Sequence, residues 1–148
     1  MKGFHESNNN SKNIYNKNSA FDVNKKLYKR AINLQNKGDF VQAAKTYNIL
    51  LKKNFRTEEF FLNYAIVSQY LKNTNSSIIL LKEAIKINSK NFIPFFKMGF
   101  ILNNKGCFYE AYPFAKKATE LEPNHWQNHH NLIKILINLN RPKEAVNI

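Results

Sequence analysis

The chain repeats itself every 34 residues from residue 24 onward, and this periodicity constrains its fold more than any other feature. Two columns of the repeat illustrate it, one of large apolar residues and one of small residues: Leu27, Phe61 and Phe95, then Ala31, Ala65 and Gly99. Equal units at a fixed interval stack side by side, because each one buries its apolar face only against its neighbours. The sequence therefore predicts a solenoid made of one recurring unit.

Each repeat has the pattern of two helices joined by a short turn. Apolar residues at offsets of 3, 4 and 7 place one apolar stripe on each helix. The turn contains Gly38 in the first repeat and Gly106 in the third. Glycine adopts the left-handed backbone conformation of such turns without the steric clash that a Cβ would cause. Small residues such as Ala43 and Ala111 allow the two helices to pack closely. We predict three complete repeats and a partial one: residues 24–57, 58–91, 92–125 and 126–148.

The third repeat carries the clearest family signature. Its characteristic residues, in chain order, are Phe95, Met98, Gly99, Leu102, Gly106, Phe108, Ala111, Ala118 and Pro123. Small residues, an inter-helix glycine, an aromatic residue and a closing proline in this order resemble the tetratricopeptide repeat. The resemblance covers residues 24–148 and implies an all-α, right-handed superhelical solenoid that acts as a protein-interaction scaffold. The second repeat departs from the pattern, since Lys72 stands where glycine is usual, and we expect a weaker turn there.

The N-terminal segment differs in composition from the repeats. Residues 1–23 are rich in Asn, Lys and Ser and show no sustained periodicity, which predicts a disordered leader. No apolar run approaches the roughly 20 residues that cross a bilayer, and the first residues lack the apolar core of a secretory signal. The one cysteine, Cys107, cannot form an internal disulfide. These features favour a cytoplasmic protein.

The positive charge of the chain is concentrated in the first repeat. The formal net charge is +13, and residues 24–57 contribute nine Lys or Arg against one Asp, a net +8. A basic surface attracts acidic peptides, nucleic acids or anionic membranes. No recognised groove-reading motif accompanies the charge, so a nucleic-acid-binding module is an alternative to protein binding and not the expected function.

The family resemblance also implies where a partner binds. In the family, the first helices of successive repeats line a concave groove that holds peptides. The matching positions here are Lys25, Tyr28, Lys29, Ile32, Leu62, Asn63, Ile66, Phe96, Lys97, Phe100, His130, Asn131 and Lys134. Asparagine both donates and accepts hydrogen bonds, so Asn63 and Asn131 could hold a peptide backbone, similar to the asparagine ladder that precedes O-linked N-acetylglucosamine transferase domains. The competing interpretation is a solvated polar helix face in an asparagine-rich chain.

Nothing in the pattern predicts catalysis, a metal or a cofactor. The histidines His125, His129 and His130 have helical spacing with Glu122, but His129 falls in a packing column and no second cluster completes a coordination sphere. Phosphate-binding glycine loops, nucleophile signatures and recognisable carboxylate pairs are missing from the sequence. An alternative is that the chain recruits substrates for a glycosyltransferase, sulfotransferase or methyltransferase whose catalytic part is separate.

The fourth repeat is incomplete. Residues 126–148 stop within the expected second helix, which leaves an apolar face of the array uncovered. We therefore expect this end to offer a surface for self-association, besides the protein or peptide partner in the groove, for which an acidic peptide is one candidate.

Some members of the family hold the acidic C-terminus of heat-shock chaperones with five basic and amide residues. The corresponding positions are Tyr28, Ile32, Asn63, Ile93 and Lys97, and only Asn63 and Lys97 have suitable chemistry. We expect no tight binding of such a tail, because most of the charge-assisted hydrogen bonds are missing. A sub-micromolar dissociation constant in titration calorimetry with an acidic chaperone peptide would contradict this prediction.

Overall fold

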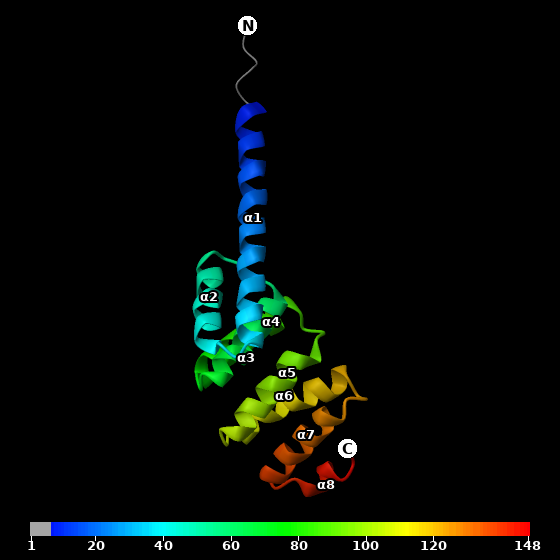
Figure 1. The fold of residues 1–148 in the computed structure, drawn as a ribbon. Helices are drawn as coiled ribbons and strands as arrows, with labels where there is room; N and C mark the ends of the chain where they lie inside the picture. Colours follow the sequence, from blue (N-terminus) through cyan, green and yellow to red (C-terminus); the bar gives the residue numbers. More distant parts are fainter. Residues whose placement is uncertain (1–6) are drawn as a thin grey trace. The chain divides into compact units, whose positions relative to one another are not determined.

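The structure, a computed structural model, describes the backbone of residues 7–148 and the side chains of residues 22–148, and this part of the chain contains helices and no strand. The helices are α1 (Ser7–Asn36), α2 (Phe40–Lys52), α3 (Glu58–Tyr70), α4 (Thr74–Ile87), α5 (Phe92–Asn104), α6 (Phe108–Leu121), α7 (Trp126–Asn138) and α8 (Pro142–Ala145) (Figure 1). They form two compact units, an N-terminal unit, Met1–Arg56, and a C-terminal unit, Thr57–Ile148.

The N-terminal unit is a pair of packed helices. Helix α1 contacts α2, and the aromatic ring of Tyr28 lies 6.3 Å from that of Tyr47 between ring centroids. Tyr47 is fully buried and donates a hydrogen bond of 2.9 Å from its hydroxyl to Oε1 of Gln35. Helix α2 begins after Asp39, whose carboxylate accepts the backbone N–H of Gln42 at 3.1 Å. A helical hairpin of the predicted kind results.

The predicted disordered leader overlaps the start of α1. Its residues 1–6 lie outside the described residues, whereas residues 7–23 belong to α1 in the structure. The composition of this stretch and its lack of sustained periodicity are the basis of the prediction. The leader, with its boundary at residue 23, stays a prediction.

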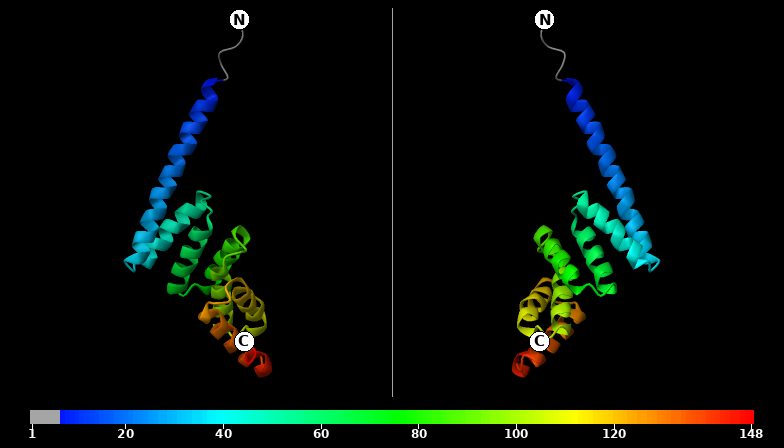
Figure 2. Two further views of the ribbon diagram at one scale, coloured as in Figure 1. Left: turned by 90° about the vertical axis from the view of Figure 1, so that its right-hand side faces the viewer. Right: turned by 90° about the vertical axis from the view of Figure 1, so that its left-hand side faces the viewer.

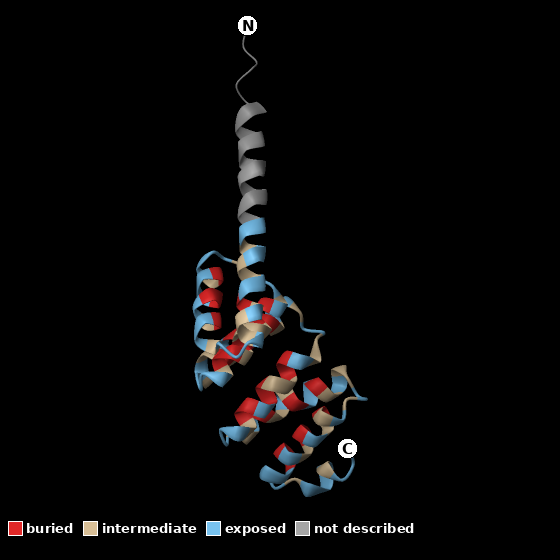
Figure 3. Ribbon diagram, in the orientation of Figure 1, coloured by how far each residue is buried: buried red, intermediate tan, exposed pale blue. Residues whose placement is uncertain are grey.

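The C-terminal unit stacks three helix pairs in chain order. Each helix from α3 to α8 contacts the next one along the chain, and α5 also contacts α7, so the first helices of the last two repeats are neighbours (Figure 2). Buried residues lie on the facing sides of these helices (Figure 3). The core includes Phe61, Ala65, Leu81, Ala84, Met98, Ala111, Ala115, Ala118, Leu132 and Leu136. The small and large columns of the sequence therefore form the packed interior.

The turn inside each repeat has the same geometry in both units. The residue at one column has a positive φ in all four repeats: Gly38 at 78°, Lys72 at 58°, Gly106 at 77° and Asn140 at 57°. The following residue donates its N–H to the carbonyl five positions earlier, as from Cys107 to Leu102 at 2.9 Å and from Asn73 to Ser68 at 2.8 Å. This bond closes the C-terminus of the first helix in the manner of a Schellman motif. The second repeat thus makes the same turn as the others, with lysine in the left-handed region.

The described helices can be compared with membrane-spanning helices in length and apolar character. Across residues 7–148 no helix combines the length and the apolar character that crossing a bilayer requires.

Replacing Lys72 by glycine tests the cost of the left-handed turn. The Lys72→Gly variant should raise the free energy of unfolding by about 0.5 to 1 kcal/mol, because glycine removes the clash of Cβ with the backbone at positive φ. Urea denaturation would measure the change. Lys82→Gly, at an exposed position inside α4, is the control and should lower the same quantity by about 1 kcal/mol. A loss of stability in Lys72→Gly would refute the explanation.

Candidate functional site

The predicted groove residues are distributed over both units. Lys25, Tyr28, Lys29 and Ile32 lie on α1 of the N-terminal unit, and the remaining residues lie on α3, α5 and α7 of the C-terminal unit. A groove continuous through both units stays a prediction. The C-terminal unit contains a site that can be described directly.

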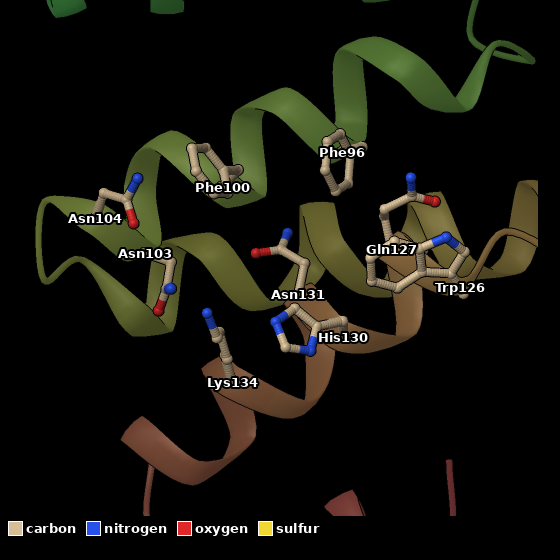
Figure 4. A pocket seen from close by; sticks show the side chains of 9 residues that line it. All are labelled: Phe96, Phe100, Asn103, Asn104, Trp126, Gln127, His130, Asn131 and Lys134. Carbon is tan, nitrogen blue, oxygen red and sulfur yellow. The ribbon is translucent and has the colours of Figure 1, made fainter.

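An open pocket of about 240 Å³ lies between α5 and α7, and we call it the α5–α7 pocket (Figure 4). Its lining residues are Phe96, Phe100, Asn103, Asn104, Trp126, Gln127, His130, Asn131 and Lys134. The sequence predicted Phe96, Phe100, His130, Asn131 and Lys134 as groove residues, and the structure brings these five together. It did not predict Asn103, Asn104, Trp126 and Gln127. A helical signal existed for Trp126, which lies one turn before His130 on the same face of α7.

Aromatic rings form two walls of the α5–α7 pocket. Phe96 and Phe100 stack along α5 with ring centroids 6.3 Å apart, and Trp126 and His130 lie along α7 with centroids 6.2 Å apart. Both pairs have the spacing i and i+4, which places them on one helix face. Trp126 is 68% exposed and Phe100 is 46% exposed, so the pocket presents large aromatic surfaces to solvent.

Asn131 lies between the aromatic walls and points towards α5 (Figure 4). It is only 4% exposed, and its Nδ2 is buried without a hydrogen-bond acceptor among the described residues. Its position depends on Gly99, because a Cβ at residue 99 would lie 3.1 Å from Nδ2 of Asn131 and 3.1 Å from the backbone nitrogen of Ala115. The missing side chain at Gly99 therefore allows the amide to pack directly on α5. A buried amide without a partner is costly unless a ligand or water completes its hydrogen bonds.

The end of the pocket near the C-termini of α5 and α7 is polar. Nδ2 of Asn138 donates a hydrogen bond of 2.9 Å to Oδ1 of Asn103, which ties the ends of α5 and α7 together. Lys134 is exposed and lines the pocket beside Asn103 (Figure 4). This end can therefore offer an ammonium group and amides to a polar ligand.

The other predicted groove residues of the C-terminal unit do not line this pocket. Leu62, Asn63 and Ile66 are half-buried on α3. Asn63 and Asn131 occupy the same repeat column, but only Asn131 belongs to the pocket, so a shared asparagine ladder stays a prediction. Lys97 is half-buried on α5, and burial lowers the pKa of its amine because a low-dielectric environment disfavours the charged form.

The histidines that precede the pocket have separate packing roles. The ring of His125 lies 4.7 Å from that of Phe92 between centroids, and Nε2 of His129 lies 2.6 Å from the carbonyl oxygen of Pro123. Asn128 donates from Nδ2 to the carbonyl oxygens of Ala118 and Glu122, at 2.9 and 3.1 Å, and so links α7 to the end of α6. In the part of the chain with described side chains, no group of three His, Cys, Asp or Glu residues could hold a metal ion.

Comparison by sequence finds no protein-family model and no curated protein that matches this chain. Solved structures do match it. MamA from Desulfovibrio magneticus RS-1, from residue 41 to its end, superposes with a TM-score of 0.76 at 18% identity, over 84% of this chain and 70% of that one. YrrB, described as a TPR protein with an unusual peptide-binding site, gives 0.74 at 19% identity, over 82% and 62% of the two chains.

A third match includes a bound peptide. The first TPR of Spaghetti (RPAP3), bound to the HSP90 peptide SRMEEVD, superposes with a TM-score of 0.72 at 19% identity, over 79% of this chain and 93% of that one. At these identities the likeness shows the fold alone. The predicted resemblance and the all-α tetratricopeptide-repeat fold class are confirmed.

Replacing Lys97 by methionine tests the burial of its amine. Below the lowered pKa the charged amine penalises the folded state, and this penalty disappears as the pH rises to the ordinary value of 10.5. We therefore expect Lys97→Met to be more stable than the wild type at pH 7 and the difference to shrink towards pH 10.5. Urea denaturation at both pH values measures it.

The matched control is Lys82→Met on α4, where the lysine is exposed. It should show a smaller difference from the wild type and no shrinkage with pH. A Lys97→Met protein that is less stable than the wild type at pH 7 would contradict the role of burial.

Proposed function

We propose that this chain, which has the tetratricopeptide-repeat fold, is a non-catalytic protein-interaction module that binds a peptide segment of a partner protein. In the C-terminal unit the peptide lies along the side that carries the predicted groove residues of α3, α5 and α7, and the α5–α7 pocket holds one of its side chains. The observation that carries the proposal is the buried amide of Asn131 between exposed aromatic walls.

The chemistry of the pocket supports a peptide over other ligands. An asparagine amide donates and accepts hydrogen bonds at once, and a peptide backbone offers both partners in every residue. Tryptophan and other aromatic side chains that are exposed in a concave site contribute much of the binding energy of protein interfaces. Trp126 and Phe100 have these properties. Of the similar structures, YrrB is described with a peptide-binding site and the RPAP3 domain with a bound peptide, which supports the same ligand class.

The N-terminal unit supports a second candidate, binding of an anionic partner. Its exposed basic residues include Lys25 and Lys29, one helical turn apart on α1, and Lys45 and Lys52 on α2. Such a surface attracts an acidic peptide by long-range electrostatics and nucleic acid by counterion release. A peptide partner with an acidic segment would combine the two proposed functions, because its acidic segment would bind the basic residues of the N-terminal unit. A cytoplasmic location and self-association through the incomplete last repeat remain part of the proposal.

Peptides selected from a random display library against the whole chain test the proposal. Selected peptides should bind Phe100→Ala and Asn131→Ala at least about tenfold more weakly than the wild type, as expected for central interface residues. Fluorescence anisotropy with labelled synthetic copies gives the affinities. The Asn131→Ala protein should keep its unfolding free energy, because the variant removes an Nδ2 group that is buried without a hydrogen-bond partner.

Tyr109→Ala is the matched control, since Tyr109 is 84% exposed on α6 and does not line the pocket. It should bind the selected peptides like the wild type. If the library yields no binder, or if the selected peptides bind both pocket variants as tightly as the wild type, the proposed function is wrong for this site.

A further inference from the structure

The charges around the α5–α7 pocket have one sign. Helix α5 contains Lys97 and helix α7 contains Lys134, and neither helix contains an aspartate or a glutamate. Lys134 lines the pocket, is exposed, and makes no ion pair among the described residues. An ammonium group beside a cavity without a carboxylate favours an anionic group on the ligand.

The aromatic walls alone are compatible with two kinds of ligand group. Rings that surround a cavity can bind a cation by their negative faces, and they can equally bury an apolar or aromatic side chain. The first is disfavoured here, because a ligand cation would approach Lys134 without a compensating carboxylate in the pocket lining. The combination of rings and ammonium group therefore favours an apolar occupant.

The size of the pocket suits one aromatic side chain. Its volume is about 240 Å³, and the pocket is open on one side. A closed apolar cavity of about 150 Å³ holds a benzene molecule. A phenyl or phenol ring therefore fits in the pocket with room for its connecting backbone, to which Nδ2 of Asn131 can donate a hydrogen bond.

The pocket has an aromatic part and a polar end. The rings of Phe96, Trp126 and His130 form the aromatic part, with Gln127 beside Trp126, whereas Asn103, Asn104 and Lys134 gather at the other end (Figure 4). A ring seated in the aromatic part thus places its neighbouring group towards the ammonium of Lys134. This arrangement distinguishes the two ends of a bound segment.

We propose that the α5–α7 pocket recognises a peptide in which an aromatic side chain is followed directly by a carboxylate, with the ring between the aromatic walls and the carboxylate on Lys134. The inference rests on the proposed function and narrows its ligand to an aromatic and acidic motif. The carboxylate comes either from the next side chain or from the end of the peptide, and these two sources share the same chemistry at Lys134.

Trp126 supplies a readout at the site itself. It is the one tryptophan of the chain and lies in the pocket wall, so its fluorescence reports on this pocket when the peptide contains no tryptophan. Short peptides with Gly and Ser flanks and capped ends would carry Phe-Glu, Phe-Gln, Ala-Glu or Phe-Lys at the centre, and a fifth would end in Phe with a free carboxylate. Binding should shift the emission of Trp126 to shorter wavelength, because the ring of the peptide displaces water from the indole.

We expect the Phe-Glu peptide to bind about tenfold more tightly than Phe-Gln, because the glutamine loses the ion pair, and more tightly than Ala-Glu, because the alanine leaves the walls empty. Tighter binding of the peptide with the terminal carboxylate than of Phe-Glu would support the inference with the chain end as the source. Tightest binding of Phe-Lys would overturn it in favour of a cation site.

Two lysine variants of the full chain locate the carboxylate. In Lys134→Gln the preference for Phe-Glu over Phe-Gln should disappear, while Lys82→Gln, an exposed lysine of α4 outside the pocket, should retain it. A preference that survives in Lys134→Gln overturns the inference.

The two proposals fail in different ways. If library peptides depend on Phe100 and Asn131 but contain no aromatic and acidic motif, and Phe-Glu binds no better than Phe-Gln, this inference is wrong and the proposed function stands. If no peptide depends on those two residues, both are wrong.

Discussion

The close approach of α5, α6 and α7 at Gly99 is the contact on which the candidate site depends. A single added carbon at that position would lie 3.1 Å from the backbone of Ala115 and 3.1 Å from the amide of Asn131, closer than packed atoms normally come. The preceding repeats place Ala65 and Ala31 in this column, and both are fully buried. The column has to be small because helices at packed distances leave no space for a larger side chain. Only the third repeat reduces it to glycine, and there the amide of Asn131 comes close to the backbone of α5.

Polar contacts then fix where α7 lies relative to α6. The amide of Asn128 donates to the carbonyl oxygens of Ala118 and Glu122 at the end of α6, in addition to the backbone N–H groups that these oxygens accept. Towards the other end, the guanidinium of Arg141 lies 4.5 Å from the ring centroid of Tyr112 and pairs with Glu144 at 2.6 Å. The pair with Glu144 is partly exposed, so it contributes more to orientation than to stability. The rings on α7 are therefore held in place by the hydrogen bonds of the buried Asn128 side chain and by packing.

Repetition made the fold predictable, and the site was predictable only in part. A period of 34 residues is preserved in the small columns because every interface between neighbouring helices imposes the same steric limit, so Gly99 and Ala111 could be assigned without a structure. The groove positions were predicted from the helix face alone, and Phe96 and Asn131 among them line the α5–α7 pocket. Trp126 was missed although it lies one helical turn before His130, because the helix face alone does not show whether the start of α7 reaches the edge of the pocket. The left-handed geometry of Lys72 shows the opposite case, in which the position in the repeat outweighs the identity of the residue.

The contrast between packing columns and groove columns would place binding specificity in the pocket and not in the scaffold. The columns that pack helices repeat from one unit to the next, whereas the columns of the predicted groove vary because they are not held to one size by helix packing. Where α5 has Phe96 and Phe100, α3 has Leu62 and Ile66 at the equivalent positions, which are aliphatic and half-buried. Identical backbones therefore present an aromatic surface at one repeat and an aliphatic surface at the preceding one. A partner peptide that lies across both helices would meet a different chemical environment at each repeat, and its register on the scaffold would follow from matching an aromatic residue to the α5–α7 pocket.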